Sequence, residues 1–150
     1  MKVTQTKTNS LEELDSFGIE LLAQLQMKNR EQAVVLALSG DLGAGKTTLV
    51  QTIARDLGVI EAVTSPTFVI MNQYETTDKY FSKLIHIDAY RIEDIAEMKT
   101  LGFETLLKRP NTLICIEWAE RIKPLLPVDA VRLELSADKN GIHIISGYGN

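Results

Sequence analysis

Three glycines, one lysine and two threonines lie close together in SGDLGAGKTTL, residues 39–49. Residues 40–47 fit the pattern G-x-x-x-x-G-K-[ST] at every position. Glycines let the backbone point several N–H groups into one hollow, and a following helix adds its positive N-terminal end. Because such a hollow binds phosphate oxygens, the segment predicts a nucleoside-triphosphate site.

Within this loop we expect Lys46 to reach the β- and γ-phosphates and the Thr47 hydroxyl to ligate Mg²⁺. The predicted nucleotide-binding residues are Gly40, Asp41, Leu42, Gly43, Ala44, Gly45, Lys46, Thr47 and Thr48. The glycine spacing does not fit the dinucleotide pattern G-x-G-x-x-G. The motif by itself leaves ATPase, kinase and GTPase open.

The neighbouring segments suit such a loop. The apolar run 33–38 predicts a strand that is buried on both faces, as in parallel sheets. Residues 46–57 predict a helix that ends at Gly58. The loop therefore joins a buried strand to a helix, which is the context that this motif requires.

Two other predicted strands end in a carboxylate. Asp88 closes the strand 83–88, and Glu117 follows the strand 112–116. Because sites in such sheets lie at the C-terminal ends of the strands, we expect both acids near the phosphate loop. Either acid could ligate Mg²⁺ or polarise an attacking water, and the residues alone do not divide these roles.

The segment TSPTF, residues 64–68, is a turn rich in hydroxyl groups. In nucleotide switches, the corresponding connection carries a hydroxyl that senses the γ-phosphate, and Thr67 or Ser65 could do so here. The alternative is an ordinary proline turn. Composition favours a core position for Trp118 over one near the nucleotide. His86 lies in a predicted buried strand, two residues before Asp88, and is expected to be a satisfied core histidine rather than a catalytic base.

The remaining pattern predicts one P-loop nucleotide-binding domain over residues 1–150. Its fold class is α/β, a P-loop NTPase three-layer sandwich with a mostly parallel central sheet and a C-terminal antiparallel hairpin. The other expected elements are an edge strand at 3–8, a helix that begins with a capping box at Ser10–Glu13, a strand at 68–74, two short helices within 92–107 that break at Gly102, and a hairpin of 130–136 and 142–146 with an Asn140-Gly141 turn.

Composition excludes several classes of protein. The net charge is −4 at pH 7 and the basic residues are scattered, so direct, tight nucleic-acid binding is not favoured without a partner. The single cysteine, Cys115, excludes an internal disulfide and is expected in the core. Without an apolar N-terminal signal or a long apolar run, the sequence predicts a cytoplasmic protein with no membrane contact.

Four motifs in this order resemble the TsaE family of P-loop ATPases in bacterial tRNA threonylcarbamoyladenosine biosynthesis. They are GDLGAGKTT at 40–48, SPTF at 65–68, HIDAYR at 86–91 and IEWAE at 116–120. The resemblance covers roughly residues 8–146. Each motif except the phosphate loop is moderate evidence alone, and the four together are specific.

The resemblance implies ATP and Mg²⁺ as cofactors and slow ATP hydrolysis by the isolated chain. It implies two partners, the threonylcarbamoyl transferase subunit (TsaD-like) and its inactive paralogue (TsaB-like), with tRNA contacted indirectly through the complex. The complex modifies adenosine 37 of tRNAs that read codons starting with A, and hydrolysis resets it between rounds. The catalytic residues implied are Lys46, Thr67, Asp88 and Glu117; the metal ligands are Thr47, Glu117 and Asp88; and Trp118 joins the nucleotide-binding residues.

Two alternatives remain, a small-molecule P-loop kinase and a nucleotide-dependent switch. A kinase lid carries arginines, whereas the corresponding segment 91–109 is acidic between its basic ends. A GTP-dependent switch needs Asn-Lys-x-Asp, and Ala137–Asn140 does not replace it. Arg91 is the one candidate for an arginine finger, so we expect weak hydrolysis alone and stimulation by partners.

Overall fold

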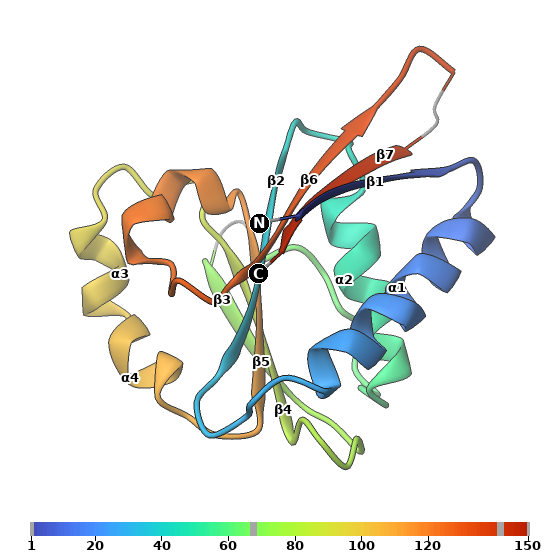
Figure 1. The fold of residues 1–150 in the computed structure, drawn as a ribbon. Helices are drawn as coiled ribbons and strands as arrows, with labels where there is room; N and C mark the ends of the chain where they lie inside the picture. Colours follow the sequence, from blue (N-terminus) through green and yellow to red (C-terminus); the bar gives the residue numbers. More distant parts are fainter. Residues whose placement is uncertain (1, 67–68, 141–142, 150) are drawn as a thin grey trace.

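The computed structural model describes residues 2–66, 69–140 and 143–149 (Figure 1). The strands are β1 Lys2–Thr8, β2 Val34–Gly40, β3 Met71–Glu75, β4 Lys83–Asp88, β5 Thr112–Glu117, β6 Val131–Ala137 and β7 His143–Gly149. The helices are α1 Leu11–Gln26, α2 Lys46–Asp56, α3 Ala96–Thr100, α4 Phe103–Leu107 and the 3₁₀ helix η1 Ala119–Leu125. Within the described residues, no helix is both long and apolar enough to cross a membrane.

The described strands form one sheet in the order β1-β7-β6-β2-β5-β4-β3. The four central strands, β6, β2, β5 and β4, pair in parallel. Antiparallel strands flank them, with β3 beyond β4 and the pair β7 and β1 beyond β6. The predicted α/β fold with a mostly parallel centre and a C-terminal hairpin is therefore confirmed.

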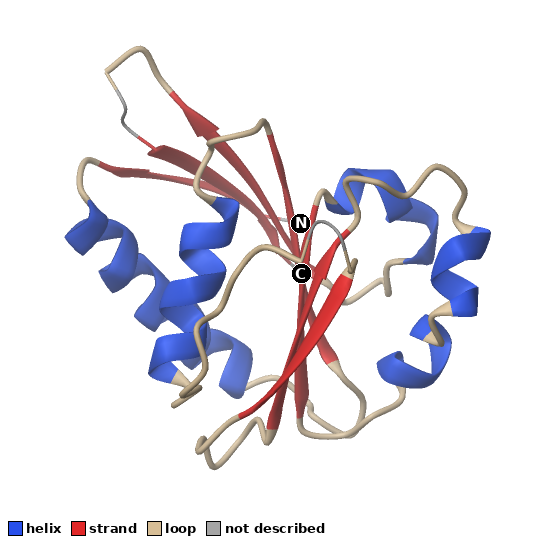
Figure 2. Cartoon of the chain, turned by 180° about the vertical axis from the view of Figure 1, so that it is seen from behind, coloured by secondary structure: helices blue, strands red, loops and turns tan. Residues whose placement is uncertain are grey.

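Helices cover both faces of the sheet, α1 and α2 on one side and α3, α4 and η1 on the other (Figures 1 and 2). Alternate residues of β2 enter the two cores, since Leu36 and Leu38 pack with α1 and α2 whereas Val35 and Ala37 pack on the opposite face. This explains why the run 33–38 is apolar at every position. The three layers predicted from the sequence are present.

The helix α1 begins with the predicted capping box, with one difference. The Ser10 hydroxyl accepts a hydrogen bond from the Glu13 N–H at 3.1 Å. The Glu13 carboxylate accepts from the N–H of Asn9, one residue before the cap, at 2.5 Å. The Ser10 hydroxyl therefore satisfies a donor that the first helical turn leaves free, and Glu13 satisfies the N–H just before the helix.

A polar contact joins α1 to α2, the helix that follows the phosphate loop. Asp15 of α1 accepts from the Thr52 hydroxyl at 2.7 Å and pairs with Arg55 at 2.9 Å. The Thr52 hydroxyl, and then Arg55, lower the pKa of the Asp15 carboxyl. This contact adds to the apolar packing between α1 and α2.

The start of one predicted strand needs correction, and two predicted positions lie outside the residues that the structure describes. The strand predicted at 68–74 begins only at Met71, because Ile70 has a φ of 68° and its carbonyl accepts the Asp88 N–H at 2.8 Å. Phe68, like Gly141 of the predicted Asn-Gly turn, lies outside the described residues. The break between α3 and α4 at Gly102 and the buried position of Cys115 are confirmed, and burial raises the pKa of the Cys115 thiol.

Candidate nucleotide site

A cavity of about 480 Å³ lies at the C-terminal end of the parallel strands, over the loop between β2 and α2. It is lined by Leu42, Gly43, Ala44, Gly45, Lys46, Thr47, Thr48, Ser65, Asp88, Tyr90, Glu117 and Trp118. The fold therefore brings most of the predicted site residues to one hollow. Gly40 and Asp41 line instead a neighbouring cavity of about 500 Å³ beside β6 and η1.

Lys46 is the buried cation of this cavity, with only 4% of its surface exposed. Its Nζ donates to the carbonyl oxygens of Gly40 and Asp41. It also lies 4.1 Å from the ring centroid of Trp118. Burial lowers the pKa of the Lys46 ammonium, and nearby carboxylates, Glu117 foremost, oppose that effect. A positive charge is thus held where phosphate groups would enter.

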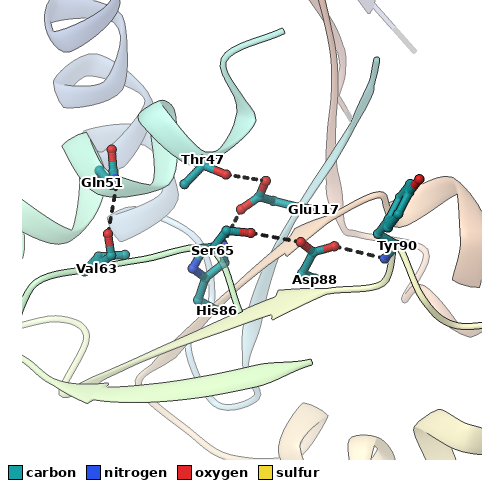
Figure 3. Close-up of polar contacts among 8 residues, drawn as sticks. All are labelled: Thr47, Gln51, Val63, Ser65, His86, Asp88, Tyr90 and Glu117. Atoms are coloured by element: carbon teal, nitrogen blue, oxygen red, sulfur yellow. Dashed lines mark hydrogen bonds and ion pairs between the residues drawn. The ribbon is translucent and has the colours of Figure 1, made fainter. Parts of the chain in front are cut away.

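Glu117, at the end of β5, connects the phosphate loop to a buried histidine (Figure 3). Its Oε1 accepts from the Thr47 hydroxyl at 2.7 Å, and its Oε2 lies 2.5 Å from Nε2 of His86. Glu117 is 3% exposed and His86 is fully buried. The acid nearest to the threonine of the loop is therefore Glu117, on the strand next to β2.

Asp88, at the end of β4, contacts Ser65 and the backbone of Tyr90. One carboxylate oxygen accepts from the Ser65 hydroxyl at 3.0 Å and the other from the Tyr90 N–H at 2.9 Å (Figure 3). Gln51 of α2 donates to the Val63 carbonyl at 2.8 Å and so ties the segment before Ser65 to the helix. Thr67 lies outside the described residues, so Ser65 is the hydroxyl of the TSPTF segment that can be placed at the site.

An aromatic pair forms one wall of the cavity. The Trp118 and Tyr90 ring centroids lie 4.9 Å apart, and the Arg121 guanidinium lies 5.4 Å from the Tyr90 ring. Trp118 has a φ of 57° and is half-buried, so it packs on the core and also lines the cavity. Trp118 therefore packs on the core, as composition favours, and also lies beside the phosphate loop, where the resemblance puts it.

Sequence reasoning missed three residues around the site. His86 is a buried core residue, as predicted, but its contact with Glu117 was not predicted. Glu120 accepts a hydrogen bond from the Gly40 N–H at 3.3 Å, and Arg121 stacks on Tyr90. The HxD spacing was a usable signal for His86, because alternation puts residues 86 and 88 on one face of the strand. No local pattern marks Arg121.

The residues at the foot of the loop fit a magnesium ion. The Thr47 hydroxyl and the Glu117 carboxylate are hard oxygen donors, and 2.7 Å separates them. Mg²⁺ favours such ligands, usually one or two from protein with the rest from water and phosphate. Asp88 offers further carboxylate oxygens on the neighbouring strand, where it pairs in register with Glu117.

Comparison with known proteins identifies relatives that match most of the chain. A profile of the TsaE family, described as "Threonylcarbamoyl adenosine biosynthesis protein TsaE", matches residues 8–144. The tRNA threonylcarbamoyladenosine biosynthesis protein TsaE of Haemophilus influenzae is 32% identical over 146 residues, which cover 89% of this chain and 90% of the relative. The protein of the same name from Aquifex aeolicus is 45% identical over 107 residues, 70% and 69% of the two chains.

A solved structure agrees with these sequence matches. The crystal structure of Bacillus subtilis YdiB superposes on this chain with a TM-score of 0.75 and 25% sequence identity. The superposition covers 99% of this chain and 86% of YdiB. Since the family profile spans nearly all of the sequence and includes every strand end that builds the cavity, the chain belongs to the TsaE family of threonylcarbamoyl adenosine biosynthesis proteins.

Proposed function

We propose that this chain is a magnesium-dependent ATPase that is required to form threonylcarbamoyladenosine at position 37 of tRNAs reading codons that start with A. It acts with a transferase subunit and the inactive paralogue of that subunit, and ATP hydrolysis resets their complex between turnovers. The observation that carries the proposal is the contact between Thr47 and Glu117 beneath a complete phosphate loop, in a chain of the TsaE family.

The phosphate loop and the charged side chains of the cavity each have a role in this proposal. The loop amides and the Lys46 ammonium bind the β- and γ-phosphates and neutralise the charge that develops during hydrolysis. Thr47 and Glu117 hold Mg²⁺, which supplies further charge neutralisation at the phosphates. Asp88, which Ser65 and the Tyr90 N–H hold in place, orients the attacking water.

The rim of the cavity supports a role for partner proteins. Leu42 is 89% exposed and Tyr90 is 46% exposed, and both line the cavity. Large exposed apolar side chains at a binding site are typical of surfaces that another protein covers. The net charge of −4 supports contact with tRNA through those partners rather than through this chain.

The experiment is ATP hydrolysis by the purified chain, alone and then with the two partners and tRNA. We expect slow hydrolysis alone and strong stimulation by the complex, because groups that partners supply to the γ-phosphate raise rates by about 10³–10⁵. Lys46→Ala is the inactive control. Fast hydrolysis by the isolated chain, or transfer of phosphate to an added small molecule, would contradict the proposal.

A further inference from the structure

His86 is a polar residue in an otherwise apolar part of the core. It is fully buried in the middle of β4, and it pairs in register with Cys115 of β5. Its neighbours along the same face of β4 are Leu84, which is also fully buried, and Asp88 at the cavity. Burying an imidazole costs free energy unless it is hydrogen-bonded, so apolar packing alone does not explain a histidine at this position.

The ring has one hydrogen-bond partner among the described residues, the carboxylate of Glu117. Its Nε2 lies 2.5 Å from Oε2 of Glu117, whereas Nδ1 is buried with no partner in the described part of the chain. A carboxylate only accepts hydrogen bonds, so Nε2 carries the hydrogen in this contact. The imidazole therefore serves the site rather than the surrounding core.

The contact divides the two oxygens of Glu117 between two neighbours. Oε2 contacts Nε2 of His86, and Oε1 accepts a hydrogen bond from the Thr47 hydroxyl. A glutamate has three side-chain torsions, and a second hydrogen bond removes the freedom to turn Oε1 away from the loop. Outer partners of this kind orient ligating carboxylates at metal sites.

We infer that His86 is a positioning residue, which donates a hydrogen bond to Glu117 and so keeps the opposite carboxylate oxygen aimed at the magnesium position beside Thr47. The inference rests on the proposed function, since it assumes that Mg²⁺ binds there with the nucleotide. It assigns His86 no contact with the nucleotide, so the affinity for metal-free ATP is independent of it.

Two variants separate positioning from simple burial. The side-chain amide nitrogen of His86→Gln reaches about as far from the backbone as histidine Nε2, so this variant can still donate to Glu117. The amide of His86→Asn stops near the level of Nδ1 and cannot reach the carboxylate. Leu84→Val is the matched control, because it perturbs the same buried face of β4 without a polar contact.

The measurement is the Mg²⁺ concentration that half-saturates the protein–ATP complex. Trp118, the only tryptophan of the sequence, lies 4.1 Å from Lys46 Nζ, so its fluorescence reports binding without a label. Each protein is first titrated with ATP in EDTA, and Mg²⁺ is then added. Circular dichroism melting curves show which variants are folded at the temperature used.

For His86→Asn we expect a half-saturating Mg²⁺ concentration about 10–100-fold above the unmodified chain. His86→Gln and Leu84→Val should stay within about threefold, and metal-free ATP affinity should be unchanged throughout. Folded His86→Asn with unchanged Mg²⁺ dependence overturns the inference, as does His86→Gln with a defect as large as that of His86→Asn. If the unmodified chain binds no ATP, or binds ATP with the same affinity in the presence and absence of Mg²⁺, the proposed function itself is contradicted.

Discussion

The first glycine of the phosphate loop makes a close backbone contact that allows a quantitative test. Gly40 pairs with Leu135 in the β2–β6 register and has a φ of 133°. A Cβ at Gly40 would lie 2.0 Å from the Leu135 carbonyl oxygen. Gly43, in the same loop, has a φ of 79° but nothing within 4 Å of an added Cβ. Gly40→Ala and Gly43→Ala therefore both put an alanine at a positive φ, and Gly40→Ala adds a collision with the Leu135 backbone.

The free energies of unfolding follow from these two terms. Holding an alanine at a positive φ costs about 1–3 kcal/mol in either variant. At Gly40, the two strands must also separate by about 1 Å to reach a tolerable contact, and such overpacking costs about 1–3 kcal/mol more. We expect Gly40→Ala to be less stable than Gly43→Ala by about 1–3 kcal/mol. The loss of glycine entropy in the unfolded chain is the same in both and cancels.

The assay is urea unfolding of both variants at pH 7 and 25 °C, followed by circular dichroism. Equal slopes against urea would show that the midpoints can be compared as stabilities. Equal stability of the two variants, or a larger loss for Gly43→Ala, would refute the reasoning. Gly40→Ala should also weaken ATP binding, because the Gly40 carbonyl holds the Lys46 ammonium and moves with the strand.

Three further predictions follow from the other contacts. Lys46→Ala should lower the affinity for ATP by about 100-fold, if charged hydrogen bonds worth about 3 kcal/mol are lost. Glu117→Ala should lower the rate of hydrolysis more than the affinity for ATP. Equal losses of ATP affinity in equilibrium titrations of the two variants would contradict these separate roles. Cys115→Ala should lower stability by about 1 kcal/mol and leave hydrolysis per folded molecule unchanged, and the native thiol should resist a thiol reagent because it is buried and its pKa is raised. The lowered pKa of Asp15 contributes stability above its ordinary value of 3.8 that is lost as pH falls through the lower folded value. Thr52→Val, which removes the largest cause of that shift, should therefore narrow the difference in urea stability between pH 7 and pH 3, and an unchanged difference would show that the Thr52 hydroxyl is not its source.

Sequence patterns predicted the elements whose signals are local. The phosphate loop has a fixed spacing between a run of apolar residues and a helix, and each of these signals lies within a short segment. The capping box at Ser10 and the break at Gly102 are local in the same sense. These predictions succeeded because neighbours in the chain determine the backbone conformation there.

Features that depend on a distant segment could not be predicted from local patterns. The strand β3 starts at Met71 because Ile70 has a φ of 68°, in a turn where its carbonyl accepts a hydrogen bond from Asp88 of the neighbouring strand. Trp118 lines the cavity because a positive φ directly after β5 turns the chain over the loop, which no propensity of tryptophan predicts. His86 lies in the core as predicted, but its contact with Glu117 could not be predicted because that residue lies 31 positions away in sequence.

The chemistry of the site depends on the register of three parallel strands more than on any single motif. Leu38 of β2 pairs with Glu117, and Glu117 pairs with Asp88 of β4, so both acids stand level with the start of the phosphate loop. The same register puts His86 two residues below Asp88 on the same face of the sheet as Glu117. A slip of β4 by one residue would turn His86 and Asp88 to the opposite face and break both of their contacts. The apolar residues on both faces of β4 oppose such a slip only weakly, because a strand buried on both sides tolerates either orientation. His86 and Asp88, which alternate on one face of β4, therefore specify the register of the strand as well as the site. A variant of His86 should be tested for the pairing of β4 with its neighbours as well as for the Mg²⁺ concentration that half-saturates the protein–ATP complex.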